Sequence, residues 1–220
     1  AIFWAPKAFG QEPHEAQPAH AAAEERAAVL RSPISWAIVG FFGLQSLGFY
    51  AILGWLPTLL IASGQTPAAA GAYLGLATAV GIPAGLVLSG VIGRFKSLAW
   101  WAAGASLATL LGYLSLLLTF SEQGFTVPAC ILLGLGQAST FPMSLSIIGT
   151  RASTRAQTTQ LSAMAQGWGY LLAALGTFLV GLLASLTGSW SLSVILLAAL
   201  TAAQVAVGFY SGRPGLIPAK

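Results

Sequence analysis

The stretch PISWAIVGFFGLQSLGFYAILGWLPTLLI, residues 33–61, decides the fold class, because it is predominantly apolar and contains no Asp, Glu, His, Lys or Arg. A helix of about 20 apolar residues spans the hydrocarbon core of a bilayer. Ser32 precedes the stretch as a helix N-cap, and Pro33 takes the first helical position. Proline suits this position, because an N–H there would have no partner within the helix. The stretch is therefore predicted to be a transmembrane helix.

The same pattern recurs along the rest of the chain. Thr66 and Pro67 repeat the start signal, and each further apolar stretch is followed by a short loop. The sequence thus predicts an all-α, polytopic membrane protein with six transmembrane helices. Their expected bounds are 33–61, 67–92, 98–120, 127–150, 156–186 and 191–210.

The composition agrees with a protein surrounded by the lipid bilayer. Of the 220 residues, 56% are hydrophobic and only 6% are charged, whereas soluble domains carry about 25% charged residues. The net charge of +4 does not indicate a nucleic-acid partner, because the basic residues stand in short loops between apolar spans. The single cysteine, Cys130, has no partner for a disulfide and is expected to be a small buried hydrophobic side chain.

All nine lysines and arginines fall on one side of the six predicted crossings. Arg94, Lys96, Arg151 and Arg155 stand in loops between spans, and the alternate loops contain no basic residue. The positive-inside rule then predicts that both termini are cytoplasmic. Two roles stay open for these four loop charges, namely setting the topology and gating. The remaining basic residues are Lys7, Arg26, Arg31, Arg213 and Lys220.

No ionisable Asp, Glu, His, Lys or Arg occurs inside any predicted span. General acid–base catalysis and metal binding both need such groups. We therefore expect no enzyme activity, no metal site and no cofactor. If transport were coupled to protons, the titrating group would have to lie outside these helices.

The polar side chains within the spans are neutral. Gln45, Gln137 and Gln166 either line a solute pathway or join helices through buried hydrogen bonds, since a buried amide needs several partners. Tyr50 and Trp168 are predicted to be walls of the same pathway. The alternative for Trp168 is an indole packed between helices. These five residues form the predicted solute pathway.

Small residues recur at spacings that allow helices to approach each other. Gly71 and Gly75, and likewise Gly81 and Gly85, are four residues apart, which lets backbones come close. One face of the span 156–186 carries small and polar residues at helical spacing. This stripe consists of Ser162, Gln166, Gly169, Ala173 and Gly176.

Several segments resemble a known transporter family. Residues 167–176 are GWGYLLAALG and lead to LTGSW at 186–190, residues 134–142 are GLGQASTFP, and residues 44–50 are LQSLGFY, followed by WLPT at 55–58. In this order they resemble the eleventh helix with its following loop, the tenth helix and the seventh helix of the major facilitator superfamily, within its cyanate-permease-like branch. That branch includes cyanate and 2-nitroimidazole transporters.

A loop motif of the superfamily, G-x-x-x-D-R/K-x-G-R/K, is only loosely matched. Residues 85–94 align with it, but Ser89 stands in the place of the acid and Gly90 in the place of the base. The resemblance therefore does not imply a charge-mediated gate at this loop.

The resemblance implies that the chain is the C-terminal half of a twelve-helix carrier in a bacterial inner membrane. Residues 1–7 would end the preceding helix, 8–32 would be the central cytoplasmic loop, 33–210 the six-helix bundle and 211–220 the cytoplasmic tail. The missing partner would be the N-terminal six-helix half. The implied substrate is a small solute, with cyanate-like anions or small heterocycles as examples, transported by alternating access. The alternative is a self-contained six-helix membrane protein that acts as a homodimeric transporter or a structural subunit.

Overall fold

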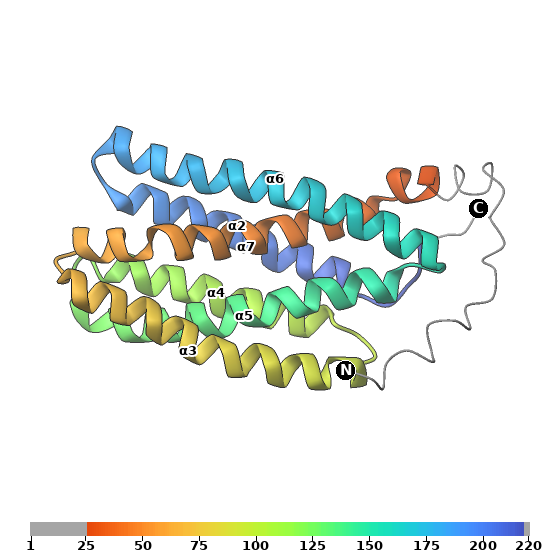
Figure 1. Cartoon of the computed structure of the whole chain (residues 1–220), viewed down its shortest axis with the longest axis horizontal. Coiled ribbons are helices and arrows are strands. Elements are labelled where there is room, and N and C mark those ends of the chain that lie inside the picture. Colours follow the sequence, from red (N-terminus) through yellow and green to blue (C-terminus); the bar gives the residue numbers. More distant parts are fainter. Residues whose placement is uncertain (1–25, 218–220) are drawn as a thin grey trace, which may run out of the picture.

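The computed structural model describes residues 26–217, and within them six helices are long and apolar enough to cross a membrane (Figure 1). This confirms the all-α fold with six spans. Residues 26–31 are also helical; the predicted end of a preceding helix at 1–7 and most of the predicted loop 8–32 lie outside the described residues. The long helices are α2 (Pro33–Ala62), α3 (Pro67–Val91), α4 (Ala99–Leu118), α5 (Thr126–Arg151), α6 (Arg155–Thr187) and α7 (Trp190–Ser211). Two short 3-10 helices are η1 (Ile92–Arg94) and η2 (Gln123–Phe125).

Local sequence signals account for the helix ends. Pro33 and Pro67 both begin a helix, and the Thr66 hydroxyl accepts a hydrogen bond from the Ala69 N–H at 3.2 Å. Gly188 ends α6 with a φ of 65°, a left-handed conformation that glycine adopts without a steric penalty. The largest difference from a predicted bound is at α4, which ends at Leu118 rather than residue 120.

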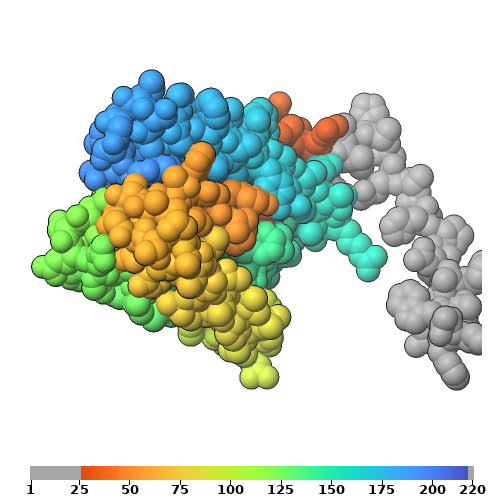
Figure 2. Space-filling view, turned by 60° about the vertical axis from the view of Figure 1, so that its left-hand side comes forward, coloured from red at the N-terminus to blue at the C-terminus, as the bar shows by residue number. Residues whose placement is uncertain are grey.

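The six helices run alternately in opposite directions. α2 packs along α6 and α7, α4 lies between α5 and α7, and α3 packs on α5. α6 and α3 therefore lie at opposite edges of the bundle (Figure 1). In Figure 2, α2 (orange) lies between α6 (blue) and α3 (yellow) on the face turned to the viewer.

Close packing of α3 on α5 depends on glycine. A Cβ added to Gly81 or Gly85 would lie 3.0 Å from a backbone carbonyl oxygen of α5. Gly134 of α5 sits directly against the backbone of α3, so the two helices touch along their main chains. The prediction for Gly81 and Gly85 is confirmed. A Cβ at Gly71 or Gly75 would meet nothing within 4 Å among the described residues, so a close helix contact at these two positions stays a prediction.

The stripe on α6 separates into two parts. Gly169, Ala173 and Gly176 are buried, and an added Cβ on Gly169 would lie 3.3 Å from the backbone of Gly43 in α2. These small residues let α6 approach α2. The polar residues of the stripe bond to each other instead of crossing to another helix, as described below.

The basic residues of the described chain gather at one end of the bundle, on the right in Figure 1. Arg151 is only 5% exposed there. Its Nε and Nη2 donate to the Ser211 carbonyl at 2.9 and 2.6 Å, and its Nη1 donates to the Gly215 carbonyl at 2.6 Å. Arg151 therefore fastens the chain that follows α7 to the end of α5. This anchoring role differs from the two roles considered from the sequence, namely setting the topology and gating.

Candidate functional site

A small cavity of about 280 Å³ lies between α2, α5 and α6, and we call it the central cavity. It brings together Gln45 and Tyr50 from α2 with Gln137 from α5, three of the five residues predicted for a solute pathway. Gln45 and Gln137 stand near the middle of their helices, and so at membrane depth. The other lining residues are Ser46, Phe49, Ala138, Phe141 and Tyr170.

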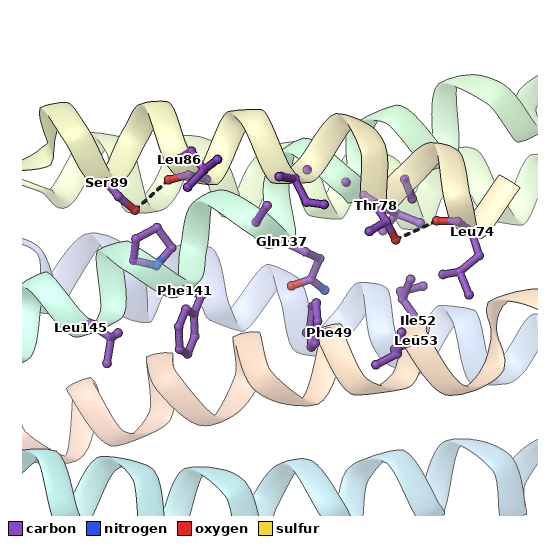
Figure 3. Close-up of a pocket in the computed structure, with 18 residues that line it drawn as sticks. Phe49, Ile52, Leu53, Leu74, Thr78, Leu86, Ser89, Gln137, Phe141 and Leu145 are labelled. Atoms are coloured by element: carbon purple, nitrogen blue, oxygen red, sulfur yellow. Dashed lines mark hydrogen bonds between the residues drawn. The ribbon is translucent and has the colours of Figure 1, made fainter. Parts of the chain in front are cut away.

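Two further hollows continue the central cavity along the same face of the bundle. A groove of about 540 Å³ between α2, α3 and α5 shares Phe49, Gln137 and Phe141 with it (Figure 3). A hollow of about 400 Å³ between α2 and α6 shares Tyr50 and Tyr170. The three together form one recess, which we call the inner recess. It extends from α3 across α5 and α2 to α6.

Gln137 is held by a buried hydrogen-bond network. The Tyr113 hydroxyl, from α4, donates to the Gly48 carbonyl at 3.1 Å, and Gln137 Nε2 donates to the Tyr113 oxygen at 3.5 Å. Gly48 is required for this approach, because a Cβ there would lie 2.5 Å from Gln137 Nε2. The network orients the amide of Gln137 with its nitrogen towards α4.

The other end of the same amide is unsatisfied. Gln137 is 5% exposed, and its Oε1 has no hydrogen-bond partner among residues 26–217. Figure 3 shows the side chain between α2 and α3, above Phe49. A buried acceptor without a partner costs about 1–3 kcal/mol. The side chain of Gln137, whose oxygen is this buried and unused acceptor, lines both the central cavity and the groove.

Gln45 is held differently. It is 1% exposed, and its Nε2 donates to the hydroxyl of its neighbour Ser46 at 2.7 Å. This bond keeps the amide folded against its own helix at the cavity wall. The two glutamines therefore line one cavity but do not bond to each other in the hydrogen bonds of the described residues.

Aromatic rings form most of the remaining wall. The ring of Tyr170 lies edge-on to Phe42 at a centroid distance of 5.3 Å and 6.4 Å from the ring of Tyr50. Phe42 also meets Phe141 at 6.2 Å. Such ring pairs surround apolar or planar ligands well, and the tyrosine hydroxyls add polar contacts. Tyr113 and Tyr170 were not among the predicted site residues, although Tyr170 stands one helical turn after Gln166.

Gln166 and Trp168 do not line the central cavity. Gln166 donates through Nε2 to the Ser162 hydroxyl at 2.7 Å, within α6. Trp168 is 54% exposed, with its ring 6.4 Å from that of Trp36, and so is not packed in the helix interior. Their part in a solute pathway stays a prediction.

The residues that line the inner recess carry no charge. Within the described chain, the basic side chains of the six long helices stand at helix ends, at Arg151 and Arg155. No group of three or more potential metal ligands occurs in residues 26–217. The chemistry available to the recess is therefore neutral hydrogen bonding and aromatic contact.

Six membrane-length helices around a neutral, aromatic recess define a polytopic membrane protein of the transporter type. The chain belongs to the Major Facilitator Superfamily, which matches residues 1–177. This confirms the resemblance to that superfamily, which is a family of transporters and not of enzymes.

Three relatives are informative. The chain is 34% identical to the 2-nitroimidazole transporter of Escherichia coli K12 over 185 residues, 84% of this chain and 46% of that protein. It is 32% identical over 189 residues, 86% of this chain and 47% of the other, to the uncharacterized transporter YycB of Bacillus subtilis 168. It is 26% identical over 162 residues, 74% and 41%, to the cyanate transport protein CynX of E. coli K12. The chain spans about half the length of the curated relatives it matches.

Proposed function

We propose that this chain is the C-terminal half of a carrier that moves a small solute across the membrane by alternating access. The observation that carries the proposal is the inner recess, where Gln137, a held amide with a buried and unused acceptor, lines an aromatic cavity at mid-membrane. Solute sites of such carriers lie near the bilayer midplane, at the interface of two repeats. The recess would be one wall of that site.

The second wall would be the N-terminal six-helix half. α3 and α6, which flank the inner recess, are the least buried of the six spans. Leu86 of α3 and Phe178 of α6 are 69% and 64% exposed. A second half packed on this face would close the recess, and the relatives are about twice as long as the matched region.

The orientation follows from the charges. Arg94, Lys96, Arg155 and Arg213 all stand at the end where α3, α5 and α7 finish. By the positive-inside rule this end faces the cytoplasm, which would place both termini of the chain there.

The chemistry of the recess favours a neutral heterocycle over an anion as the solute. The Gln137 Oε1 accepts hydrogen bonds and would pair with a ring N–H, while Tyr50 and Tyr170 would contact a planar ring. A cation would strengthen the binding of an anion such as cyanate, and none lines the described part of the recess. We therefore propose a 2-nitroimidazole-like heterocycle, the solute named for one relative.

The experiment compares uptake of labelled 2-nitroimidazole by cells that express the whole gene or this chain alone. We expect uptake only with the whole gene product, and its recovery when this chain is co-expressed with the upstream segment. Uptake by this chain alone at the rate of the whole product would favour the homodimeric alternative. A gene without upstream membrane spans would favour that alternative as well.

A further inference from the structure

An apolar groove lies on the other face of α3 from the inner recess, and we call it the outer groove. α3 and α4 both pack on α5 and leave between them a hollow of about 970 Å³. Its α3 residues, such as Pro83 and Val87, are offset by two positions from those that line the recess, such as Gly81 and Gly85, so they point the opposite way around the helix. Val87 is 67% exposed on this face.

A smaller basic cavity of about 230 Å³ adjoins the outer groove at the charged end of the bundle. Its lining includes Lys96, Arg151 and Arg213, and Phe95 lines both hollows. The only acidic residue of the described chain, Glu122, stands at the opposite end of the bundle, just before η2. Among residues 26–217, therefore, no carboxylate neutralises the three cations.

Aromatic side chains mark the junction of the two hollows as the membrane surface. The ring of Phe95 stacks on Trp101 at 4.4 Å. The Arg213 guanidinium lies 4.7 Å above the ring of Phe209, which in turn meets Trp100 at 4.7 Å. Tryptophans and cations gather at the level of lipid headgroups, so the basic cavity lies where phosphates of the bilayer are found.

We propose that the outer groove and the basic cavity together bind one anionic phospholipid, with an acyl chain in the groove and the headgroup phosphate between Lys96 and Arg213. The apolar walls alone fit any acyl chain. The charge selects the lipid. No carboxylate of the described residues neutralises these cations, so they attract a headgroup with a net negative charge. Arg151 adds positive charge to the cavity while its own bonds hold the chain after α7 in place.

The structure provides matched variants for a test. Lys96 and Arg213 are both exposed, so alanine removes their charge without opening the core, and exposed Arg155 at the same end is the control for charge. Gly104 lines the groove, and a Cβ there would meet nothing within 4 Å in the described chain, so Gly104→Leu places a bulky apolar side chain in the groove. Gly90, equally open and outside the groove, is the control through Gly90→Leu.

The experiment is native mass spectrometry of the detergent-purified product of the whole gene, titrated with phosphatidylglycerol or with phosphatidylcholine of the same acyl chains. We expect the unmodified protein to bind phosphatidylglycerol more tightly than phosphatidylcholine. In the double variant Lys96→Ala/Arg213→Ala, the affinity for phosphatidylglycerol should fall about fivefold for each cation removed. Gly104→Leu should weaken both lipids, whereas Arg155→Ala and Gly90→Leu should leave the affinities unchanged.

Equal affinity for the two lipids in the unmodified protein would overturn the proposal. So would an unchanged phosphatidylglycerol affinity in the double variant. Inorganic phosphate is the third titrant, and if it displaced phosphatidylglycerol as a soluble competitor at similar concentration, the site would be one for free phosphate instead. If the double variant failed to fold, the single variants Lys96→Ala and Arg213→Ala would test the charge, and an unchanged phosphatidylglycerol affinity in both would overturn the proposal.

Discussion

The amide nitrogen of Gln137 lies 3.5 Å from the hydroxyl oxygen of Tyr113 and donates to it, which leaves the Gln137 oxygen buried and unpaired within the described chain. Because Tyr113 is itself fixed by the Gly48 carbonyl, a single chain of bonds crosses from α2 through α4 to α5. The amide of Gln137, the proposed solute contact, is therefore held in place before any solute binds. This preorganisation lowers the entropic cost of binding.

Gly48→Ala is expected to disturb this arrangement. The added methyl would lie 2.5 Å from Gln137 Nε2 and would push the amide away from Tyr113. Overpacking of this kind costs about 1–3 kcal/mol. We expect a reduced uptake rate and a lower melting temperature in detergent. Gly54→Ala in the same helix is the control, because a Cβ there meets nothing within 4 Å among residues 26–217. Equal behaviour of the two variants would contradict the prediction.

Gly134→Ala should impair assembly of the bundle. The new methyl would collide with the backbone of Ala77 and separate α3 from α5, a change that side-chain movement cannot relieve. We expect lower yield in the membrane and a melting temperature several degrees lower. Gly149→Ala, also in α5 but in open space, should be neutral or slightly stabilising, since alanine favours helix more than glycine does.

Arg151→Ala should release the chain that follows α7. The substitution removes three charge-assisted donors from two carbonyl groups, and bonds of this kind contribute about 1.5–3 kcal/mol each. Thermal unfolding in detergent should show a clear loss of stability. Arg155→Ala, at an exposed residue, should change the stability little. A similar loss of stability in both variants would mean that the positive charge at this end stabilises the protein, and not the anchoring bonds.

The proposed orientation can be tested with cysteines. Cys130, the one cysteine among these 220 residues, is buried and is removed first. In a Cys130→Ala background, Gln65→Cys should react with a membrane-impermeant maleimide added to intact cells, and Ser153→Cys should react only after lysis. The reverse pattern would place the basic end of the bundle outside.

Much of the fold was predictable because the bilayer imposes it. A span needs a long apolar stretch and internally satisfied backbone groups, so helix number and bounds follow from residue type alone. Which helices pack against each other is harder to predict from the sequence. Gly71 and Gly81 begin the same four-residue spacing, yet only the second faces α5, because spacing identifies a face but not the neighbour that it meets.

The site was predictable only in part for the same reason. Gln45, Tyr50 and Gln137 come together in one cavity, whereas Gln166 finds a partner in its own helix. The function of Arg151 depends on backbone carbonyls 60 or more residues away. Every residue carries such a carbonyl, so no sequence pattern marks the partner.

The central claim is that Gln137 contacts the solute. Gln204 is a matched control, because it too is a buried glutamine. Its Nε2 donates to the Ser106 hydroxyl at 3.0 Å, and its Oε1 has no partner in the described chain. It lies between α7 and α4 instead of in the recess.

The decisive measurement is the initial rate of 2-nitroimidazole uptake by whole-gene variants Gln137→Leu and Gln204→Leu at equal membrane expression. Loss of a buried hydrogen bond to the solute should lower the transport efficiency of Gln137→Leu by about 5- to 100-fold, while Gln204→Leu should transport at close to the unmodified rate. Unchanged uptake in Gln137→Leu, or an equal loss in both variants, would contradict the account.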